Sequence, residues 1–466
     1  MRLLELENLT VTFQKRVVDG ISFCINSGEI VGIVGESGSG KSMTALSLMG
    51  LTPEDAKVSW DKFSFGTAEG KPISGKDIAM IFQEPMTSLN PVLTIGKQVA
   101  EMLQIHEHIT RREAKEQTLR MLERVGLEGN EEFFYKYPHE LSGGMRQRVM
   151  IAMAMICKPR LLIADEPTTA LDIEVQEQIL ELILNLNQEM ETAVLFISHD
   201  IKLVHRFCRK VIVMNKGKIE ETGFAEQIFY EPQAEYTKAL LDALPSKEKK
   251  GRSTSECSDV LKVERLFASY GKKKVLKNIT FSLKKGEVLG IVGSSGCGKS
   301  TLAQVLAGLK VPDSGKIETL GSRVGMVFQD PYSSLNPCKT VGFLLEEPLR
   351  IRKVPKVERK QRVWEMVVWI GLSANYLKRK VDELSGGQRQ RVAIGCALMN
   401  YPEILILDEP VSALDVTIQD KICKLLNKCK EKYKLSYIFI SHDPEIMEMM
   451  CDRILRLKEG AFHNDY

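Results

Sequence analysis

Short apolar runs that lead into glycine-rich or charged segments recur along this chain, and they predict the strands of an α/β fold. Residues 3–13 and 260–270 alternate apolar with polar side chains, which is typical of strands with one buried face. Residues 30–34 and 288–292 are apolar apart from one glycine each, as expected of buried strands in a parallel sheet. The same order of patterns therefore occurs once in each half of the chain.

The repetition extends to single polar residues and keeps its spacing, which indicates an internal duplication. The distance in sequence between corresponding residues of the two halves is constant in the later part of each half and larger in the earlier part. This predicts that the first half has about a dozen extra residues of surface connection. The separation is 243 residues for Ser142 and Ser385, for Asp165 and Asp408, and for His199 and His442, 246 for Gln83 and Gln329, and 258 for Lys41 and Lys299.

The length of 466 residues allows two or more domains, each with its own core. Residues 246–259 are polar, charged and partly serine-rich, and we interpret them as a linker. We therefore predict a first domain at residues 1–245 and a second domain at residues 260–466.

Composition excludes several classes of protein. Lys and Arg number 64 against 61 Asp and Glu, a net charge of +3, so we expect no nucleic-acid partner. Ten scattered cysteines without a Cys-x-x-Cys pair predict neither a zinc site nor a disulfide framework, as in a reduced, cytosolic protein. No apolar run approaches the roughly 20 residues that cross a bilayer, and the acidic, mixed N-terminus does not resemble a secretory signal. A role at a membrane would need other chains to span it.

Two glycine-rich segments follow the predicted buried strands. Their glycines would let successive backbone N–H groups face one anion, their lysines would add charge near the outer phosphates, and their serines would offer a hydroxyl to Mg²⁺ at a helix N-terminus. A chance glycine-rich turn is disfavoured because the arrangement occurs twice, and we interpret Cys297 as a neutral position rather than a redox switch. The predicted nucleotide-binding residues are Gly35, Glu36, Ser37, Gly38, Ser39, Gly40, Lys41 and Ser42, and Gly293, Ser294, Ser295, Gly296, Cys297, Gly298, Lys299, Ser300 and Thr301.

Two apolar runs end in a pair of carboxylates, Asp165–Glu166 and Asp408–Glu409. Charges at the end of a buried strand are costly without a task. Asp165 and Asp408 suit Mg²⁺ coordination, together with the loop serines Ser42 and Ser300. Glu166 and Glu409 suit a general base that activates the attacking water. A purely structural role for the Asp, as a helix cap, is the alternative.

Further polar residues follow the other predicted strands. Gln83 and Gln329 carry amides that can both bind Mg²⁺ and orient water. His199 and His442, each within a Ser-His-Asp triplet, could contact the outermost phosphate of a bound nucleotide. A single histidine would more often be structural, but the same register in both halves favours a catalytic role.

These motifs together resemble two fused nucleotide-binding domains of an ABC (ATP-binding cassette) transporter. The most specific elements are the two LSGG signatures, followed by MRQR at 145–148 and by QRQR at 388–391; Met145 departs from the usual Gln. The resemblance implies an α/β fold of two tandem P-loop NTPase domains, each with a helical insert near residues 92–140 and 338–383. It also implies that ATP and Mg²⁺ are the cofactors and that Tyr270 and Phe13 stack on adenine, although aromatic residues on core-facing strands are the alternative.

In such proteins each signature serves ATP held by the opposite domain, so the resemblance implies two shared sites. Ser142, Gly143, Gly144, Ser385, Gly386 and Gly387 would complete them as second anion clamps. One site would join Lys41, Gln83, Asp165, Glu166 and His199 to Ser385 and Gly387, and the other would join Lys299, Gln329, Asp408, Glu409 and His442 to Ser142 and Gly144.

A finer resemblance concerns the cargo. FQEPMTSLNP at 82–91, FQDPYSSLNP at 328–337 and the segment 229–245 are similar to the nickel/peptide branch of importer ATPases. This implies uptake of peptides or nickel chelates, with two transmembrane permease subunits, an extracytoplasmic substrate-binding protein and a peripheral location on the cytoplasmic membrane face. The first domain would end in a short helical extension. No cysteine cluster follows that extension, so no iron–sulfur cluster is expected.

Two other functions remain open at this point. A soluble, non-transport ABC ATPase, such as a ribosome-associated factor, would usually carry a long charged linker, and this linker is short. A nucleotide-binding regulator without turnover is disfavoured because both Glu166 and Glu409 are present.

Overall fold

The computed structural model describes residues 1–66, 72–83, 88–168, 171, 173–244, 258–271, 273–294, 296–412 and 414–463. They form two compact units, Met1–Ala243 and Leu244–Tyr466, which we describe one at a time. The predicted linker as far as residue 257, the segment 84–87 and the predicted site residue Ser295 lie outside the described residues.

The first unit combines a mainly parallel sheet with a smaller antiparallel sheet. The parallel sheet has the order β10-β9-β3-β8-β7-β6, with β10 antiparallel to β9. In the other sheet β1 pairs with β2, β4 and β5. The strands are β1 (Arg2–Thr12), β2 (Arg16–Asn26), β3 (Ile30–Val34), β4 (Lys57–Ser59), β5 (Lys62–Phe65), β6 (Ile78–Ile81), β7 (Leu161–Asp165), β8 (Ala193–Ser198), β9 (Lys210–Asn215) and β10 (Lys218–Phe224).

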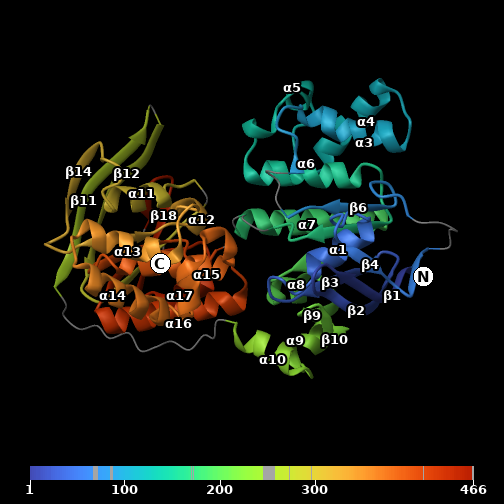
Figure 1. The fold of residues 1–466 in the computed structure, drawn as a ribbon. Coiled ribbons are helices and arrows are strands. Elements are labelled where there is room, and N and C mark those ends of the chain that lie inside the picture. The colour runs from blue at the N-terminus through green and yellow to red at the C-terminus, as the bar shows by residue number, and fades with distance from the viewer. Residues whose placement is uncertain are drawn as a thin grey trace. The chain divides into compact units, whose positions relative to one another are not determined.

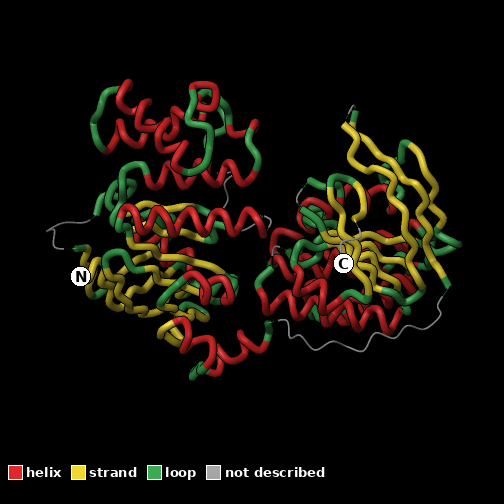
Figure 2. The backbone as a smooth tube through the Cα atoms, turned by 180° about the vertical axis from the view of Figure 1, so that it is seen from behind, coloured by secondary structure: helices red, strands yellow, loops and turns green. Residues whose placement is uncertain are grey.

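Helices connect these strands, and three of them form an insert that stands apart from the strands at one end of this unit (Figures 1 and 2). The insert consists of α3 (Ile95–His106), α4 (Arg111–Arg124) and α5 (Glu131–Phe134). The other helices are α1 (Lys41–Met49), the 3-10 turn η1 (Pro138–Glu140), α6 (Gly143–Met155), α7 (Ile173–Met190), α8 (Ile201–Phe207), α9 (Ala225–Tyr230) and α10 (Glu235–Asp242).

The second unit repeats this plan. Its larger sheet has the order β15-β16-β17-β13-β18-β19, parallel except for β19, and its smaller sheet has the order β12-β11-β14. The strands are β11 (Asp259–Tyr270), β12 (Lys273–Lys284), β13 (Val288–Val292), β14 (Ser314–Glu318), β15 (Val324–Val327), β16 (Ile404–Asp408), β17 (Ser436–Ile440), β18 (Arg453–Lys458) and β19 (Ala461–His463). The helices are α11 (Lys299–Leu306), α12 (Pro331–Ser334), α13 (Val341–Ile351), α14 (Lys356–Trp369), the 3-10 turns η2 (Ala374–Lys378) and η3 (Val381–Glu383), α15 (Gly386–Leu398), α16 (Val416–Tyr433) and α17 (Pro444–Met450).

The α/β prediction and the two helical inserts are confirmed. The apolar runs at 30–34 and 288–292 are strands β3 and β13, and both lie between two other parallel strands. The extra residues of the first half fall where β4 and β5 replace the single strand β14 as partners of the first long strand.

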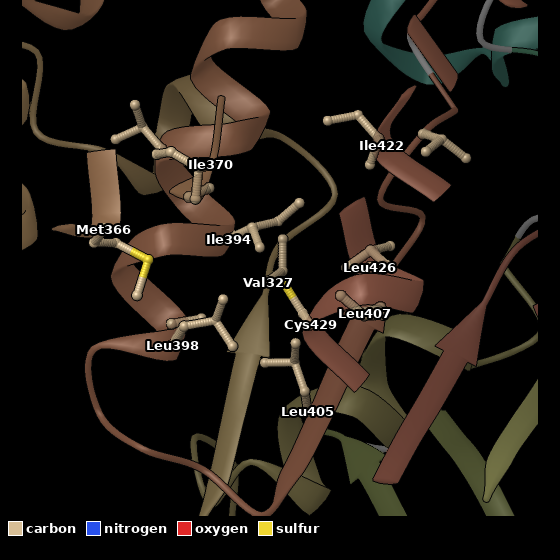
Figure 3. Close-up of a cluster of buried hydrophobic side chains, with 14 of the residues drawn as sticks. Val327, Met366, Ile370, Ile394, Leu398, Leu405, Leu407, Ile422, Leu426 and Cys429 are labelled. Atoms are coloured by element: carbon tan, nitrogen blue, oxygen red, sulfur yellow. The ribbon is translucent and has the colours of Figure 1, made fainter. Parts of the chain in front are cut away.

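In the second unit the insert and the sheet share one apolar core. Figure 3 shows side chains of α14 and α15 packed toward those of β15, β16 and α16. Burial of such aliphatic groups contributes about 1.5–3 kcal/mol each, so the insert is a packed part of its unit. The labelled residues are Val327, Met366, Ile370, Ile394, Leu398, Leu405, Leu407, Ile422, Leu426 and Cys429.

No helix among the residues described above is both long enough and apolar enough to cross a membrane.

Candidate functional site

Each glycine-rich loop joins a buried strand to a helix, as predicted. After β3 the chain turns at Gly38 and Gly40, whose φ angles of 80° and 101° favour glycine, and α1 begins at Lys41. The Lys41 ammonium donates to the carbonyls of Gly35 at 2.7 Å and Glu36 at 2.9 Å, which holds it across the loop.

The loop of the second half is built in the same way. Lys299 donates to the carbonyls of Gly293 at 2.8 Å and Ser294 at 3.0 Å. Cys297 is buried beside this lysine, and burial raises the pKa of its thiol, although Lys299 acts in the opposite direction. A thiol kept protonated is a poor nucleophile, which agrees with the interpretation of Cys297 as a neutral position.

The first carboxylate after each strand lies against the loop. The Ser42 hydroxyl is 3.2 Å from Oδ1 of Asp165. Burial raises the pKa of Asp165 and of Asp408 to about 6, although hydroxyl contacts from Ser42 and Ser300 oppose this. Oδ1 of Asp408 is buried and has no hydrogen-bond partner in the part of the chain that the structure describes. A buried carboxylate of this kind beside a hydroxyl fits a divalent cation.

The second carboxylate residue, Glu166, contacts three other residues, Ile197, Gln83 and His199. Its φ angle of 48° is in the left-handed region, which is unfavourable for a residue with a side chain, and its N–H donates to Ile197 O at 2.9 Å. Its carboxylate accepts from Nε2 of Gln83 at 3.0 Å, and its other oxygen is 3.2 Å from Nδ1 of His199. Three residues predicted separately are therefore brought together.

The second half repeats this arrangement around Glu409, whose φ angle is 46°. Gln329 donates to Oε2 at 3.0 Å, and Nδ1 of His442 is 3.4 Å from the same oxygen. Burial raises the pKa of Glu409, but the contact and charge of His442, together with the charge of Lys299 and a contact with Ser412, lower it further, so the pKa is below its usual value. Glu409 in turn raises the pKa of His442. Glu409 is thus an ionised carboxylate at neutral pH.

The neighbours of each histidine have structural roles. Asp200 caps α8 by accepting from the N–H groups of Lys202 and Leu203, and Ser198 accepts from the N–H of Asp200. Asp443 and Ser441 make the same contacts at α17. These caps fix the backbone on both sides of the histidine.

The signatures lie at helix N-termini. Ser142 caps α6, and its hydroxyl accepts from Met145 N at 3.3 Å. A Cβ on Gly144 would lie 2.7 Å from Val175, and one on Gly387 would lie 2.5 Å from Ile418, so these glycines are also needed for helix packing. No hydrogen bond among the described residues joins Ser142 to the phosphate loop of its own half.

The two signatures differ at the position after the glycines. Gln388 accepts from Ser385 N at 3.0 Å and donates to the hydroxyl of Tyr376 at 3.2 Å. Met145 stands at this position in the first half and has no amide to make such contacts. Ser385 and Gly386, like Ser142 and Gly143, are exposed.

The predicted adenine-stacking residues differ in setting. Tyr270 is 52% exposed, its hydroxyl donates to Gln304, and the Lys310 ammonium lies 3.9 Å from its ring centroid. Phe13 packs against the apolar cluster of the smaller sheet and is half-buried. Tyr270 therefore presents a more accessible aromatic face than Phe13.

Sequence reasoning missed two features of the site. Neither the composition of the chain nor the spacing of its hydrophobic residues predicts the left-handed backbone of Glu166 and Glu409. Tyr236, from α10, places its hydroxyl 3.2 Å from the N–H of Glu36 in the first loop. Only the alignment of α10 against the sheet could reveal this contact, since the two residues are 200 positions apart.

The chain matches a known family in both of its halves. Residues 18–169 and 276–412 match the ABC transporter family. The peptidoglycan transport ATP-binding protein YejF of Agrobacterium fabrum is 41% identical, over 98% of this chain and 91% of its own. The glutathione import ATP-binding protein GsiA of Pectobacterium atrosepticum is 39% identical, over 98% of this chain and 85% of its own.

Two solved structures have the same fold. The RNase-L inhibitor matches with a TM-score of 0.66 at 23% identity, over 97% of this chain and 87% of that chain. The archaeal ribosome recycling factor aABCE1, solved with the ribosomal stalk protein aP1, matches with a TM-score of 0.64 at 23% identity. The match covers 93% of this chain and 83% of that chain. At such identities the likeness concerns the fold alone.

Proposed function

The chain belongs to the ABC transporter family and is an ATPase of that family, and we propose that both of its halves hydrolyse ATP to power the import of a peptide-like solute. The observation that carries the proposal is the placement of Glu166 and Glu409. Each lies between a glutamine and a histidine, next to a strand whose final carboxylate lies near a lysine-bearing loop. Such a set can hold phosphates and deprotonate water in one place.

In this mechanism the loop amides and Lys41 or Lys299 bind and orient the phosphates. Glu166 and Glu409 accept the proton of the attacking water, which Gln83 and Gln329 orient. His199 and His442 hold the glutamates and remain within reach of the outermost phosphate. Mg²⁺, when bound, would neutralise phosphate charge, and the oxygen donors that would hold it are those of Ser42, Gln83, Asp165, Ser300, Gln329 and Asp408.

We also propose, from the family resemblance, that each signature serves the nucleotide of the other half. The exposed Ser142 and Ser385, at the N-termini of α6 and α15, have the chemistry for this task. Cysteines at Ser39 and Ser385 should crosslink in the presence of ATP in an E166Q/E409Q background. Crosslinks formed only between separate copies of the chain would contradict pairing of the two halves of one chain.

The proposed partners are two permease subunits in the cytoplasmic membrane and an extracytoplasmic binding protein. Both relatives named above are ATP-binding proteins of transport or import systems, for peptidoglycan and for glutathione. Both cargoes contain short peptides, which favours a peptide-like solute over a nickel chelate. Uptake of labelled glutathione, tripeptides, muropeptides and nickel chelate, with E166Q/E409Q as the control, would identify the cargo.

Co-purification after detergent extraction tests the membrane partners directly. Integral membrane proteins should be recovered with the chain, and recovery with ribosomes instead would support the soluble alternative. Arg111, which is exposed at the start of α4, is a suitable probe of the contact through Arg111→Glu. Lys115 is less suitable because it is engaged by Glu131 and lies over Phe134.

A further inference from the structure

Helix α10 of the first half lies on the opposite side of this unit from the helical insert, near β9 and β10 (Figure 1). From there Tyr236, in its first turn, reaches the entrance of the phosphate loop. The N–H of Glu36 donates to the Tyr236 hydroxyl at 3.2 Å. A helix that follows the last strand of this unit therefore takes part in building its nucleotide site.

The start of α10 is fixed rather than loosely placed. Glu221 of β10 accepts from the N–H groups of Gln233 at 2.8 Å and Ala234 at 3.0 Å, immediately before the helix begins. Thr237 and Leu240 of the helix are buried. The strand that carries Glu221 pairs with β9, and β9 pairs with β3, which leads into the loop. Tyr236 and the loop are thus both attached to one sheet.

The peptide group that joins Gly35 to Glu36 is held from both sides. Its N–H, which belongs to Glu36, donates to the Tyr236 hydroxyl, and its carbonyl, which belongs to Gly35, accepts from the Lys41 ammonium at 2.7 Å. The tyrosine hydroxyl is therefore linked to the lysine through a single peptide group. A loop whose first peptide plane is fixed loses less conformational freedom when phosphates bind to its remaining N–H groups.

We propose that Tyr236 is a positioning residue of the first nucleotide site, which makes the ATP affinity of that half depend on α10. The corresponding loop position in the second half is Ser294, and none of the described residues of that half places a tyrosine hydroxyl on it. The two halves then differ in how nucleotide affinity is set. A partner or ligand that moves α10 would change the first site and leave the second site unchanged.

The test is Tyr236→Phe in the full chain, which keeps the ring and removes the hydroxyl. Hydrogen exchange of peptides covering residues 35–42 and 293–300, titrated with a non-hydrolysable ATP analogue and Mg²⁺, gives a binding midpoint for each half. One neutral hydrogen bond is worth roughly a 2- to 10-fold change. We expect the analogue concentration that half-protects residues 35–42 to rise by that factor in the variant. The concentration that half-protects residues 293–300 should stay within twofold of its value in the unchanged protein. ATP turnover should show a higher KM with little change in kcat.

Tyr230→Phe is the matched control, because Tyr230 is 66% exposed in the neighbouring helix α9 and contacts rings rather than the loop. Equal midpoints in Tyr236→Phe and the unchanged protein would overturn the inference, as would an equal shift in both halves. The inference rests on the proposed ATP site at Lys41. If the unchanged protein shows no nucleotide-dependent protection of 35–42, that proposed site itself is wrong, which is a separate outcome.

Discussion

The helical inserts of the two halves are attached to the neighbouring long helix by different contacts. In the first half an ion pair joins the C-terminal end of α4 to α7, and in the second half an ammonium group of α16 lies over an aromatic ring at the C-terminal end of α14. We call these two contacts the joints of the first and second half. Arg124 of α4 donates to Glu189 of α7, and both side chains are about half exposed. In the second half Trp369 of α14 stands at the corresponding place, and the Lys432 ammonium of α16 lies 3.6 Å from its ring centroid.

These two joints differ in strength and in their response to salt. An exposed ion pair is worth about 0–1 kcal/mol and is screened by salt. A cation over a tryptophan is worth about 0.5–2 kcal/mol, and the ring also contacts Tyr433 at a centroid distance of 6.2 Å. The second insert should therefore be attached more firmly. Around Glu166 and Glu409, by contrast, both halves use the same types of partner, a glutamine and a histidine.

The largest expected effect tests the similarity of the two sites. Glu166→Gln together with Glu409→Gln should lower ATP turnover by roughly 10²–10⁴-fold, the usual loss for a general base, and leave ATP binding intact. Phosphate release and equilibrium nucleotide binding measure the two effects. The single variants should lose comparable shares of activity. A single variant with full activity would mean that the two halves are not catalytically equivalent.

The next effect tests the joint of the second half. Trp369→Ala removes both the ring and the cation contact, and it should lower the free energy of opening of α14 by roughly 2–3 kcal/mol, somewhat less than for a fully buried Trp. Hydrogen exchange of residues 356–369 measures it. Trp364→Ala is the control, because Trp364 is 55% exposed on the same helix. Equal losses in the two variants would contradict a special role for Trp369.

A smaller effect concerns pH and the Glu409–His442 contact. His442 lowers the pKa of Glu409 against the raising effect of burial, so His442→Gln should let that pKa rise. A general base works only when ionised, and turnover falls as pH falls through its pKa. The acid limb of the pH–rate profile, measured in an E166Q background, should therefore move to higher pH. His463→Gln, at an exposed position in β19, should leave the limb in place. A shift toward lower pH would contradict the assigned cause.

The smallest effect tests the joint of the first half. Arg124→Ala should lower the free energy of opening of α4 by about 0.2–1 kcal/mol at low salt and by almost nothing at 1 M salt. Hydrogen exchange of residues 111–124 at both salt concentrations measures the change. Lys432→Met in the second half is the comparison, and its cost should depend less on salt. If Arg124→Ala lowered the free energy of opening of α4 equally at low and high salt, the contact in the first half would not behave as an exposed ion pair, and the proposed difference between the two halves would be wrong.

The sequence alone determined the duplication, the buried strands and the residue types of each site. Strand ends at one edge of a parallel sheet must lie close together, so the order of strands and polar residues along the chain is enough to assign a loop lysine, a carboxylate pair, a glutamine and a histidine to one place. The glycine-rich loops and the signatures are also local patterns, since the backbone turns and helix starts that they need arise from neighbouring residues.

Tertiary structure decided what depends on distant packing. The left-handed backbone at Glu166 and Glu409 is held by strands β8 and β17, whose carbonyls accept the glutamate N–H. Tyr236 reaches Glu36 only because α10 is attached to β10, and Arg124 and Trp369 meet their partners only once the inserts have packed. No period or motif encodes such contacts, because they join residues that are remote in the chain and depend on the angle at which one element lies against another.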